Sequence, residues 1–418
     1  MVVSVIGLGY IGLPTAAILA SNGFKVHGID SNKRVVSSIN KGQIHILEPH
    51  LDSIVQKVIA NGNLKAFDKP NSADIFMIAV PTPFKNMNKP DLSFIKSAVK
   101  SISQVIKKGN MVILESTVPV GATESIKKWL FKERPDLRFP SNERDINIDD
   151  INIAHCPERV LPGDILNELV NNDRIIGGLT AHCSERAKNF YKYFIKGSCI
   201  VTDAKTAELS KLVENSYRDV NIAFANELSL ISDKLDVNVW ELIKLANLHP
   251  RVNILQPGPG VGGHCIAVDP WFIIDSAPDE ARLIHTARLV NDSKPEFICK
   301  KIKEAAKRTL KNKSKLKIVS LGLSFKANID DLRESPAMKI AKKIELMGFK
   351  INYVCEPNIK LLPSLFNSKK SQLIELNQAL VEADILVLLV DHDEFKNIDY
   401  SLIHDKEVID TRGIFIEK

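Results

Sequence analysis

The sequence has few cysteines, and their spacing excludes two classes of protein. Six occur in 418 residues, with no C-x-x-C pair and no cysteine–histidine spacing of the kind that binds zinc. A disulfide-rich secreted scaffold and a zinc-finger domain are therefore excluded. We expect reduced thiols, no metal site and a cytoplasmic location. The cysteines lie at positions 156, 183, 199, 265, 299 and 355.

Long apolar runs are also missing. No stretch approaches the roughly 20 apolar residues of a membrane-spanning helix. The first residues form a β-branched run that leads into a glycine-rich segment, so we expect no signal peptide. Nine basic residues lie between Lys300 and Lys317, against the single acid Glu304 and without any aromatic residue. A solvated helix and linker is therefore favoured there over a nucleic-acid or membrane patch.

What is present is an alternation of strand-like and helix-like segments, which predicts an α/β protein. A parallel, doubly wound sheet is expected from strands at 2–6, 25–29, 74–80, 111–115 and 152–155, with a helix over 15–22. A second unit repeats the plan with strands at 317–321, 350–355, 384–390 and 407–409 and a helix over 335–347. Between them, apolar residues at a period near 3.6 predict one long helix over 205–233, followed by a helix over 239–248.

The predicted architecture is therefore two Rossmann-like doubly wound domains joined by a helical middle domain with one long helix. A chain of 46.5 kDa is too long for one ordinary core. We place a dinucleotide-binding domain at 1–198, a central helical and dimerisation domain at 199–299, and a second Rossmann-like domain at 300–418. The polar segment Asn142–Asp150 is expected to be a surface excursion.

Gly7, Gly9 and Gly12 form a G-x-G-x-x-G fingerprint between the first strand and the first helix. The first glycine allows a tight turn, the second lets the backbone approach a pyrophosphate, and the third permits close helix–sheet packing. Asp30 ends the second strand, where a carboxylate accepts from a ribose 2′-hydroxyl and repels a 2′-phosphate. NAD is therefore predicted over NADP, with a ligand-free turn as the alternative. The second unit lacks the later two glycines, so it is expected to hold a nucleotide without clamping a dinucleotide.

Polar residues follow several predicted strands, where ligands meet an open α/β sheet. Thr82, Thr117 and Thr123 either contact a ligand or cap local turns, and the sequence leaves both open. Glu158 is a candidate general base for activating water. The alternative is a surface ion pair with the adjacent Arg159.

One helix face and one glycine-rich loop carry residues suited to covalent chemistry. Lys211, Asn215 and Arg218 share a face of the long helix, where an ammonium group and an amide can stabilise an oxyanion. Cys265 lies in the loop 258–269, and a thiolate there can add to an aldehyde. The alternatives are a solvated lysine and a buried, inert cysteine.

Together these motifs resemble the UDP-glucose/GDP-mannose dehydrogenase superfamily of nucleotide-sugar 6-dehydrogenases. They occur in order as GLGYIGLP, AVPTPF, ESTVPVG, CPERVLPG, AELSKLVENSYRDVN, HPRVNILQPGPGVGGHCIAVDPW and GLSFKANIDDLRES. His264 before the cysteine and Val268 before Asp269 are typical of the branch acting on UDP-N-acetyl-D-mannosamine. The resemblance implies a four-electron oxidation at C6 with two NAD, serving surface polysaccharide or glycan synthesis. UDP-N-acetylglucosamine, UDP-N-acetylgalactosamine and UDP-glucose remain alternative substrates.

The resemblance also implies a role for each site residue. Cys265 would trap the aldehyde as a thiohemiacetal that becomes a thioester, with Lys211 as acid/base and oxyanion group supported by Asp269. Glu158 would activate water positioned by Thr117 and Asn215. Cofactor contacts are implied at Gly7, Gly9, Tyr10, Ile11, Gly12, Asp30, Thr82, Thr123 and Arg333. UDP-sugar contacts are implied at Arg159, Val160, Lys211, Asn215, Arg218, His249, Arg251, Gly262, Phe325, Lys326 and Arg412.

Arg251 is a planar cation suited to a phosphate or carboxylate, and in this superfamily its position reaches the neighbouring subunit's site. A homodimer or a dimer of dimers is therefore expected.

Two other functions compete with this one. A one-step dehydrogenase of the 6-phosphogluconate or β-hydroxyacid kind would yield one NADH and tolerate Cys265→Ser. A catalytically silent nucleotide-sugar sensor would bind the sugar and regulate a partner.

Overall fold

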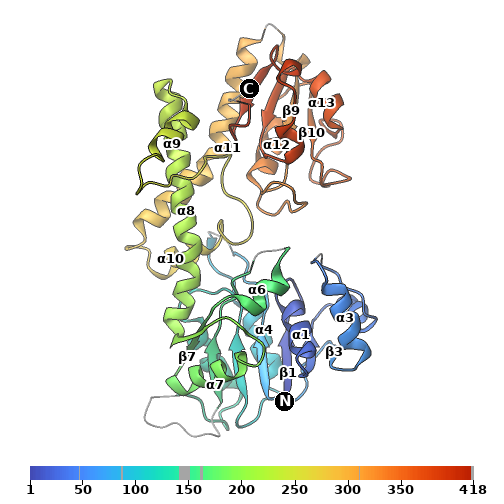
Figure 1. The fold of residues 1–418 in the computed structure, drawn as a ribbon, viewed down its shortest axis with the longest axis vertical. Helices are drawn as coiled ribbons and strands as arrows, with labels where there is room; N and C mark the ends of the chain where they lie inside the picture. Colours follow the sequence, from blue (N-terminus) through green and yellow to red (C-terminus); the bar gives the residue numbers. More distant parts are fainter. Residues whose placement is uncertain (47, 86–87, 141–150, 161–162, 310, 416–418) are drawn as a thin grey trace. The chain divides into compact units, whose positions relative to one another are not determined.

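The computed structural model describes residues 1–46, 48–85, 88–140, 151–160, 163–309 and 311–415. The chain divides into two compact units, residues 1–214 with 271–278, and residues 215–270 with 279–418. Each unit contains one β-sheet flanked by helices (Figure 1). Within the described ranges, no helix is both long and apolar enough to cross a membrane.

An eight-stranded sheet organises the first unit, in the order β3-β2-β1-β4-β5-β6-β7-β8. Its strands are β1 Val2–Ile6, β2 Lys25–Ile29, β3 Leu64–Phe67, β4 Ile75–Ile78, β5 Met111–Leu114, β6 Asn152–His155, β7 Arg174–Gly178 and β8 Cys199–Asp203. Its helices are α1 Gly12–Ser21, α2 Lys33–Asn40, α3 Leu51–Ala60, α4 Ser93–Ile102, α5 Ala122–Glu133, α6 Ile165–Asn171 and α7 Ala181–Tyr191. The strand order reverses between β1 and β4, which is where such sheets bind ligands.

Two strands of this sheet, β7 and β8, run against the prediction. Neighbouring strands are parallel except that β7 is antiparallel to β6. The all-parallel prediction is wrong here because β7 begins beyond the end of β6, so the connection containing α6 never crosses back over the sheet. The bounds predicted at 2–6, 25–29 and 152–155 are confirmed.

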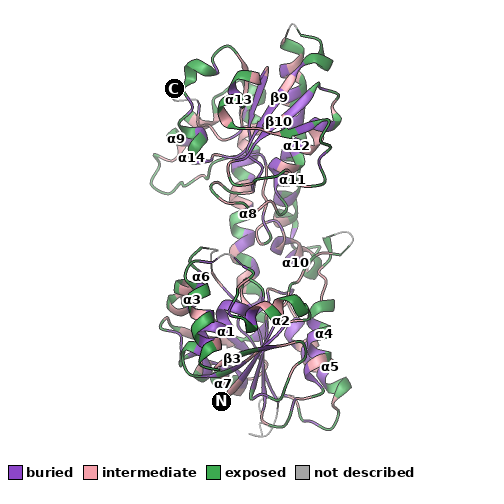
Figure 2. Ribbon diagram, turned by 90° about the vertical axis from the view of Figure 1, so that its right-hand side faces the viewer, coloured by how far each residue is buried: buried purple, intermediate pink, exposed green. Residues whose placement is uncertain are grey.

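Two apolar clusters cover the two faces of the first sheet. Along β4, Ile75 and Met77 join the cluster with α1 and α3, whereas Phe76 and Ile78 join the cluster with α4 and α5. This alternation follows from the two-residue period of a strand. Figure 2 shows the strands buried and the outer faces of the helices exposed. Both faces of the sheet are thus covered, and the loops predicted to bind ligands extend from its edge.

A five-stranded, fully parallel sheet organises the second unit, in the order β11-β10-β9-β12-β13. Its strands are β9 Lys317–Leu321, β10 Ile351–Cys355, β11 Ser371–Leu373, β12 Ile385–Leu388 and β13 Glu407–Asp410. Its helices are α9 Val239–Ala246, α11 Arg282–Arg308, α12 Pro336–Leu346, α13 Leu376–Glu382 and α14 Asp393–Lys396, with 3-10 turns at Lys313–Lys315 and Tyr400–Leu402. Helices α8 Ala204–Leu235 and α10 Asp269–Ser276 contribute residues to both units.

The long helix α8 confirms the prediction for 205–233, and it packs on α11 through buried polar side chains. Arg288 donates to the Asp219 carboxylate at 2.6 Å, and the Asn226 amide donates to Asn291 at 2.8 Å. Each of these four buried side chains thus finds a partner on the other helix, as burial favours.

The apolar repeat that predicted α8 lies largely outside this contact. Leu209, Val213, Phe224 and Ile231 are 40%, 48%, 54% and 46% exposed. The basic segment forms the end of α11, a 3-10 turn and the start of β9, which confirms the predicted helix and linker. The predicted surface excursion Asn142–Asp150 lies outside the described residues.

Candidate active site

The fingerprint glycines differ in what surrounds them. Gly7 has a φ of +93°, and a Cβ on it would lie 2.5 Å from the Ala79 carbonyl oxygen. A Cβ on Gly12 would lie 1.8 Å from the Gly7 carbonyl oxygen, whereas one on Gly9 would meet nothing within 4 Å. Two glycines therefore build the turn, and Gly9 leaves an open backbone surface that fits a pyrophosphate.

Asp30 stands beside this turn at the end of β2. Its carboxylate accepts from the Leu8 amide at 3.1 Å and from the Asn32 amide at 2.8 Å. The side chain is half-buried, which leaves it within reach of a ribose. Helix α1 has no side-chain cap at Ile11, and Tyr10 beside it is 42% exposed. The residues present therefore fit NAD, whose phosphates a helix N-terminus favours.

Of the predicted threonines, Thr82 and Thr117 follow β4 and β5, and Thr123 lies in the first turn of α5. Thr82 donates its hydroxyl hydrogen to the Thr117 carbonyl at 2.7 Å, which joins the two loops. Thr123 is fully buried, and its amide and hydroxyl donate to the Glu208 carboxylate at 2.7 and 2.6 Å. Glu208 also accepts from the Gly121 amide at 2.6 Å, so it caps α5. Sequence reasoning missed Glu208, which lies 85 residues from Thr123.

Glu158 is buried and ion-paired, so the alternative of a surface pair with Arg159 is wrong. Its carboxylate meets the guanidinium of Arg174, whose side chain is 2% exposed. Its other oxygen accepts from the Arg159 amide at 2.7 Å. The Arg159 guanidinium instead pairs with Glu214 at 2.7 Å. Arg174 opens β7 and was missed, because it lies 16 residues from Glu158 in a different element, where no local spacing rule links the two.

A second buried carboxylate, Glu115, lies in the same region. It directly follows β5, is 2% exposed, and accepts from the Tyr191 hydroxyl at 2.8 Å. Its other oxygen has no hydrogen-bond partner among the described residues. Burial raises the pKa of Glu115 to about 7, opposed by the Arg174 cation and reinforced by the charge of Glu158. The buried Arg174 cation thus interacts electrostatically with two carboxylates, Glu115 and Glu158.

The cysteine loop stands one turn ahead of α10. The Cys265 carbonyl accepts from the amides of Val268 and Asp269 at 3.0 and 2.9 Å. Asp269 is buried and accepts from the Asn215 amide at 2.5 Å, so the structure brings these two predicted residues together. Cys265 is half-buried, whereas the cysteines at 156, 183, 299 and 355 are buried. An accessible sulfur is what the predicted nucleophile needs.

The glycines around Cys265 let other parts of the same chain approach. A Cβ on Gly262 would lie 2.8 Å from Phe325 Cβ, and one on Gly258 would lie 2.5 Å from the Arg412 guanidinium. The Gly263 amide donates to the Arg333 carbonyl at 3.2 Å. Because these glycines have no side chain, the cysteine loop packs closely against residues of the same chain that are predicted to bind nucleotide.

Most of the remaining residues predicted to bind the UDP-sugar or NAD are exposed. Exposed side chains occur at Arg218, His249, Arg251 and Lys326, and Val160 is half-buried. Arg412 pairs with Asp391 and Arg333 with Asp331. The first unit holds Lys211, Glu158 and Thr117, and the second holds Cys265, Asp269 and Asn215. Among the described residues, no group of three or more His, Cys, Asp or Glu side chains is arranged to hold a metal ion.

Comparisons with known proteins cover the whole chain. Residues 1–195 match the NAD binding domain of the UDP-glucose/GDP-mannose dehydrogenase family, residues 205–293 its central domain, and residues 319–417 its UDP binding domain. The chain is 60% identical over 395 residues to a UDP-N-acetyl-D-mannosamine dehydrogenase of Campylobacter jejuni, covering 94% of this chain and 96% of that one. It is 56% identical over 416 residues to an NDP-N-acetyl-D-galactosaminuronic acid dehydrogenase of Ralstonia nicotianae, covering 100% and 96%.

A solved structure extends the likeness to three dimensions. The UDP-D-ManNAc dehydrogenase of Pyrococcus horikoshii superposes with a TM-score of 0.87 at 38% identity, covering 99% of this chain and 96% of that one. Both the α/β architecture and the cofactor class of the sequence prediction are thereby confirmed.

Proposed function

The chain belongs to the UDP-glucose/GDP-mannose dehydrogenase family, and we propose that it oxidises C6 of UDP-N-acetyl-D-mannosamine to a carboxylate. It is an NAD-dependent nucleotide-sugar dehydrogenase. The relative of Campylobacter jejuni supports the manno configuration, as do His264 and Val268 within the cysteine loop. The observation that carries the covalent route is the half-buried Cys265, one turn ahead of the Asn215–Asp269 pair.

The proposed chemistry begins with loss of hydride and a proton from the C6 alcohol. NAD, when bound, accepts hydride in each of two oxidations. Lys211 takes the hydroxyl proton as the aldehyde forms. The Cys265 sulfur then adds to the aldehyde carbon, and the carbonyl electron pair moves to oxygen, which is protonated to give a thiohemiacetal. Covalent capture keeps the reactive aldehyde from escaping.

Loss of a second hydride and a proton converts the thiohemiacetal to a thioester. Water then adds to the thioester carbon while Glu158 takes its proton, and the carbon–sulfur bond breaks to release the Cys265 thiolate. The balance is one alcohol, two NAD⁺ and one water giving one carboxylate, two NADH and three protons. Asn215 donates to the Asp269 carboxylate, and the Asp269 amide donates to the Cys265 carbonyl, so the pair lies close to the cysteine.

We also propose that Thr117 and Asn215 position the attacking water, and that Asp30 disfavours NADP. The hydrogen bonds of Asp30 fix its carboxylate beside the fingerprint turn, where a 2′-phosphate would be repelled. The predicted three domains remain our division of the chain, supported by the three matched family segments. A cytoplasmic location is proposed because NAD and nucleotide sugars are metabolites of that compartment.

A homodimer is proposed from the surface of the second unit. On α8, Tyr217, Phe224, Ile231 and Leu235 are 69%, 54%, 46% and 65% exposed, and their spacing places them along one helix face. A row of large apolar side chains of this kind marks an interaction surface. Arg251 is exposed in the same unit and is proposed to reach the partner's sugar site.

The test is the number of NADH formed per sugar, with UDP-N-acetyl-D-mannosamine compared with its gluco and galacto counterparts. We expect two NADH per sugar with the manno substrate, and no net oxidation by Cys265→Ser. The half-buried Cys199 supplies the control, since Cys199→Ser should be normal. One NADH per sugar would favour the one-step dehydrogenase, and binding without turnover would favour the sensor. The relative of Ralstonia nicotianae makes the galacto substrate the second candidate.

A further inference from the structure

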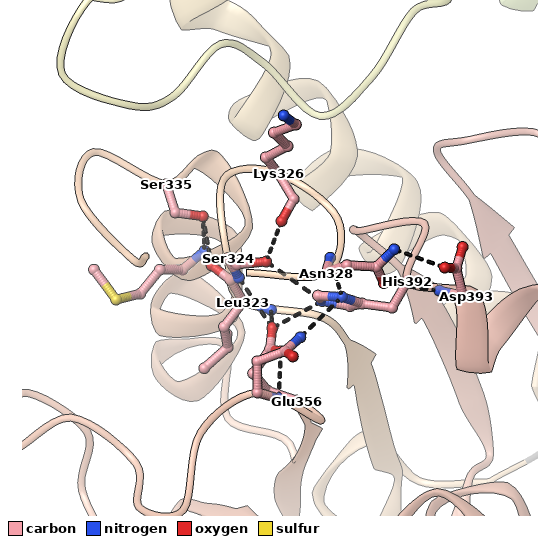
Figure 3. A network of polar contacts seen from close by, with 10 residues as sticks. Leu323, Ser324, Lys326, Asn328, Ser335, Glu356, His392 and Asp393 are labelled. Atoms are coloured by element: carbon pink, nitrogen blue, oxygen red, sulfur yellow. Dashed lines mark hydrogen bonds and ion pairs between the residues drawn. The ribbon is translucent and has the colours of Figure 1, made fainter. Parts of the chain in front are cut away.

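Three loops of the second sheet meet at one buried, hydrogen-bonded pair of side chains. They leave the carboxyl ends of β9, β10 and β12, and the pair is Glu356 with His392 (Figure 3). In the strand order, β9 lies between β10 and β12, so the order reverses between β9 and β12. Ligands of open α/β sheets bind at this edge and at this reversal.

The Glu356 carboxylate is fully engaged by the protein. One oxygen accepts from the amides of Leu323 and Ser324 at 2.7 and 3.1 Å and lies 3.1 Å from His392 Nε2. The other accepts from the Asn358 amide at 3.1 Å. Desolvation opposes ionisation, but the hydrogen bonds from His392 and Leu323 outweigh it and lower the pKa of Glu356 to about 2.

The surroundings of His392 determine which ring nitrogen carries the proton. Nδ1 lies 2.9 Å from the Asn328 amide nitrogen and 3.2 Å from Asn358 Nδ2, and both of these are donors. Nδ1 therefore accepts, and the proton resides on Nε2, which faces the Glu356 carboxylate and Ser324 Oγ. The ring, 1% exposed, thus ties all three loops together.

This ring anchors the turn formed by residues 324–328. The Ser324 hydroxyl donates to the Lys326 carbonyl at 2.7 Å, and Asn328 adopts a left-handed φ of +62°. Asn328 donates to the Asp393 carboxylate at 2.8 Å and accepts from the Asp393 amide at 3.1 Å. Figure 3 shows the Lys326 side chain pointing away from the network, and that side chain is exposed.

We propose that His392 is a positioning residue for the nucleotide: its Nδ1 holds the 324–328 turn so that Lys326 is presented to the UDP group. His392 itself touches no substrate, because it is buried behind the turn. The inference rests on the proposed function in one respect, that Lys326 contacts the UDP-sugar. It adds a residue of the loop after β12 to the predicted UDP-sugar site, to which the loop after β9 already contributes Phe325 and Lys326.

Two substitutions separate the two nitrogens of the ring. In His392→Asn the amide oxygen replaces Nδ1, so the bond from Asn328 is kept and the bond to Glu356 is lost. In His392→Gln the amide nitrogen replaces Nε2, so the bond to Glu356 is kept and the acceptor for Asn328 is lost. A purely structural role predicts that UDP affinity follows stability in both variants. The positioning role predicts opposite orders.

The measurements are thermal unfolding, calorimetric Kd for UDP, and steady-state kinetics of the full-length enzyme. His392→Gln should raise the Kd for UDP and the KM for the UDP-sugar about tenfold, the value of one hydrogen bond, and leave kcat within about twofold. His392→Asn should be the less stable variant, yet bind UDP within about threefold of wild type. Equal weakening in both variants, or wild-type Kd in His392→Gln, would overturn the proposal.

A double-mutant cycle tests whether the effect passes through Lys326. Lys326→Met should weaken UDP binding by itself, and adding His392→Gln should then change Kd by less than about twofold. Fully additive losses would contradict action through Lys326. Absence of UDP binding by the wild-type protein would instead overturn the proposed function.

A separate variant covers the case in which His392→Gln does not fold. Asn328→Gly accepts the left-handed φ but removes both side-chain bonds to Asp393. A looser turn should raise the Kd for UDP about threefold. An unchanged Kd would count against the turn as the controlling element.

Discussion

In both sheets of this protein, the chain leaves the first strand through the same kind of glycine turn. Gly7 after β1 and Gly322 after β9 have φ values of +93° and +92°. A Cβ on Gly7 would meet the Ala79 carbonyl oxygen at 2.5 Å, and one on Gly322 would meet the Val390 side chain at 2.4 Å. In both sheets the glycine therefore lets the turn approach the strand on the other side of the reversal.

Beyond this turn the two sheets diverge. The carboxylate after the second strand is half-buried Asp30 in the first sheet and fully buried Glu356 in the second. Asp30 accepts hydrogen bonds from two backbone amides, whereas Glu356 accepts from His392 as well as from backbone amides. Where the fingerprint places Gly9, the second sheet has Ser324, whose hydroxyl is used within its own turn. The same turn can therefore serve different ligands. Which ligand fits depends on whether the carboxylate after the second strand and the second fingerprint position remain accessible.

The largest effect that would break this comparison comes from the third fingerprint position. Gly12→Ala puts a Cβ 1.8 Å from the Gly7 carbonyl oxygen, and we expect a loss of about 3 kcal/mol or more in unfolding free energy. Binding of NAD should be lost with the turn. Gly9→Ala is the matched control, since its Cβ meets nothing within 4 Å, and it should change stability by less than about 0.5 kcal/mol. Urea unfolding of both variants checks this.

The acid of the second sheet should contribute stability at neutral pH. The pKa of Glu356 is lowered from 4.5 to about 2, so its contribution is present above pH 4.5 and is lost as the pH falls toward 2. At 1.36 kcal/mol per pKa unit this is about 3 kcal/mol, and Glu356→Gln should remove it. Urea unfolding between pH 3 and 7 measures the effect. Equal pH dependence in mutant and wild type would contradict the role of His392 as its partner.

A buried acid of the first sheet should show the opposite sign. The pKa of Glu115 is raised from 4.5 to about 7, so stability is highest below pH 4.5 and falls as the pH rises through 7. Glu115→Gln keeps an acceptor for the Tyr191 hydroxyl but cannot ionise. Above pH 7 it should be more stable than wild type by up to about 3 kcal/mol. A variant less stable than wild type at pH 8 would contradict this.

The smallest effect concerns the open acid. Asp30→Ala should raise the KM for NAD about tenfold and reduce the preference over NADP, because a carboxylate that accepts from ribose and repels phosphate is lost. The Kd for UDP should not change, since that acid belongs to the other sheet. Initial rates with both cofactors measure the effect. Unchanged cofactor preference would remove Asp30 from the site.

Local pattern predicted much of this fold. The bounds of β1, β2, β6 and β9, the fingerprint and α8 all follow from periods of two or 3.6 residues and from glycine spacing. The direction of β7 did not, because strand direction depends on where a connection ends. The same limit applies to partners distant in sequence, such as Glu208 for Thr123 and Arg288 for Asp219.

The candidate site, too, could be predicted from the sequence only in part. Asp269 and Asn215 were predicted and lie together, but the burial of Glu158 on Arg174 needed the folded chain. The role of His392 was also out of reach, since a lone histidine after a strand shows neither its tautomer nor its neighbours. Sequence identifies residues that carry chemistry more readily than those that hold them in place.

The interleaving of the two units has a consequence for biosynthesis. Residues 271–278 belong to the first unit although 56 residues of the second, 215–270, precede them. Among them Phe272 is fully buried, with its ring 6.1 Å from that of Phe84. A nascent chain released as far as residue 214 therefore lacks part of the first unit's interior. We expect the first unit to complete its folding on the ribosome only after residue 278 has emerged, and a protein truncated at 214 to be prone to aggregation.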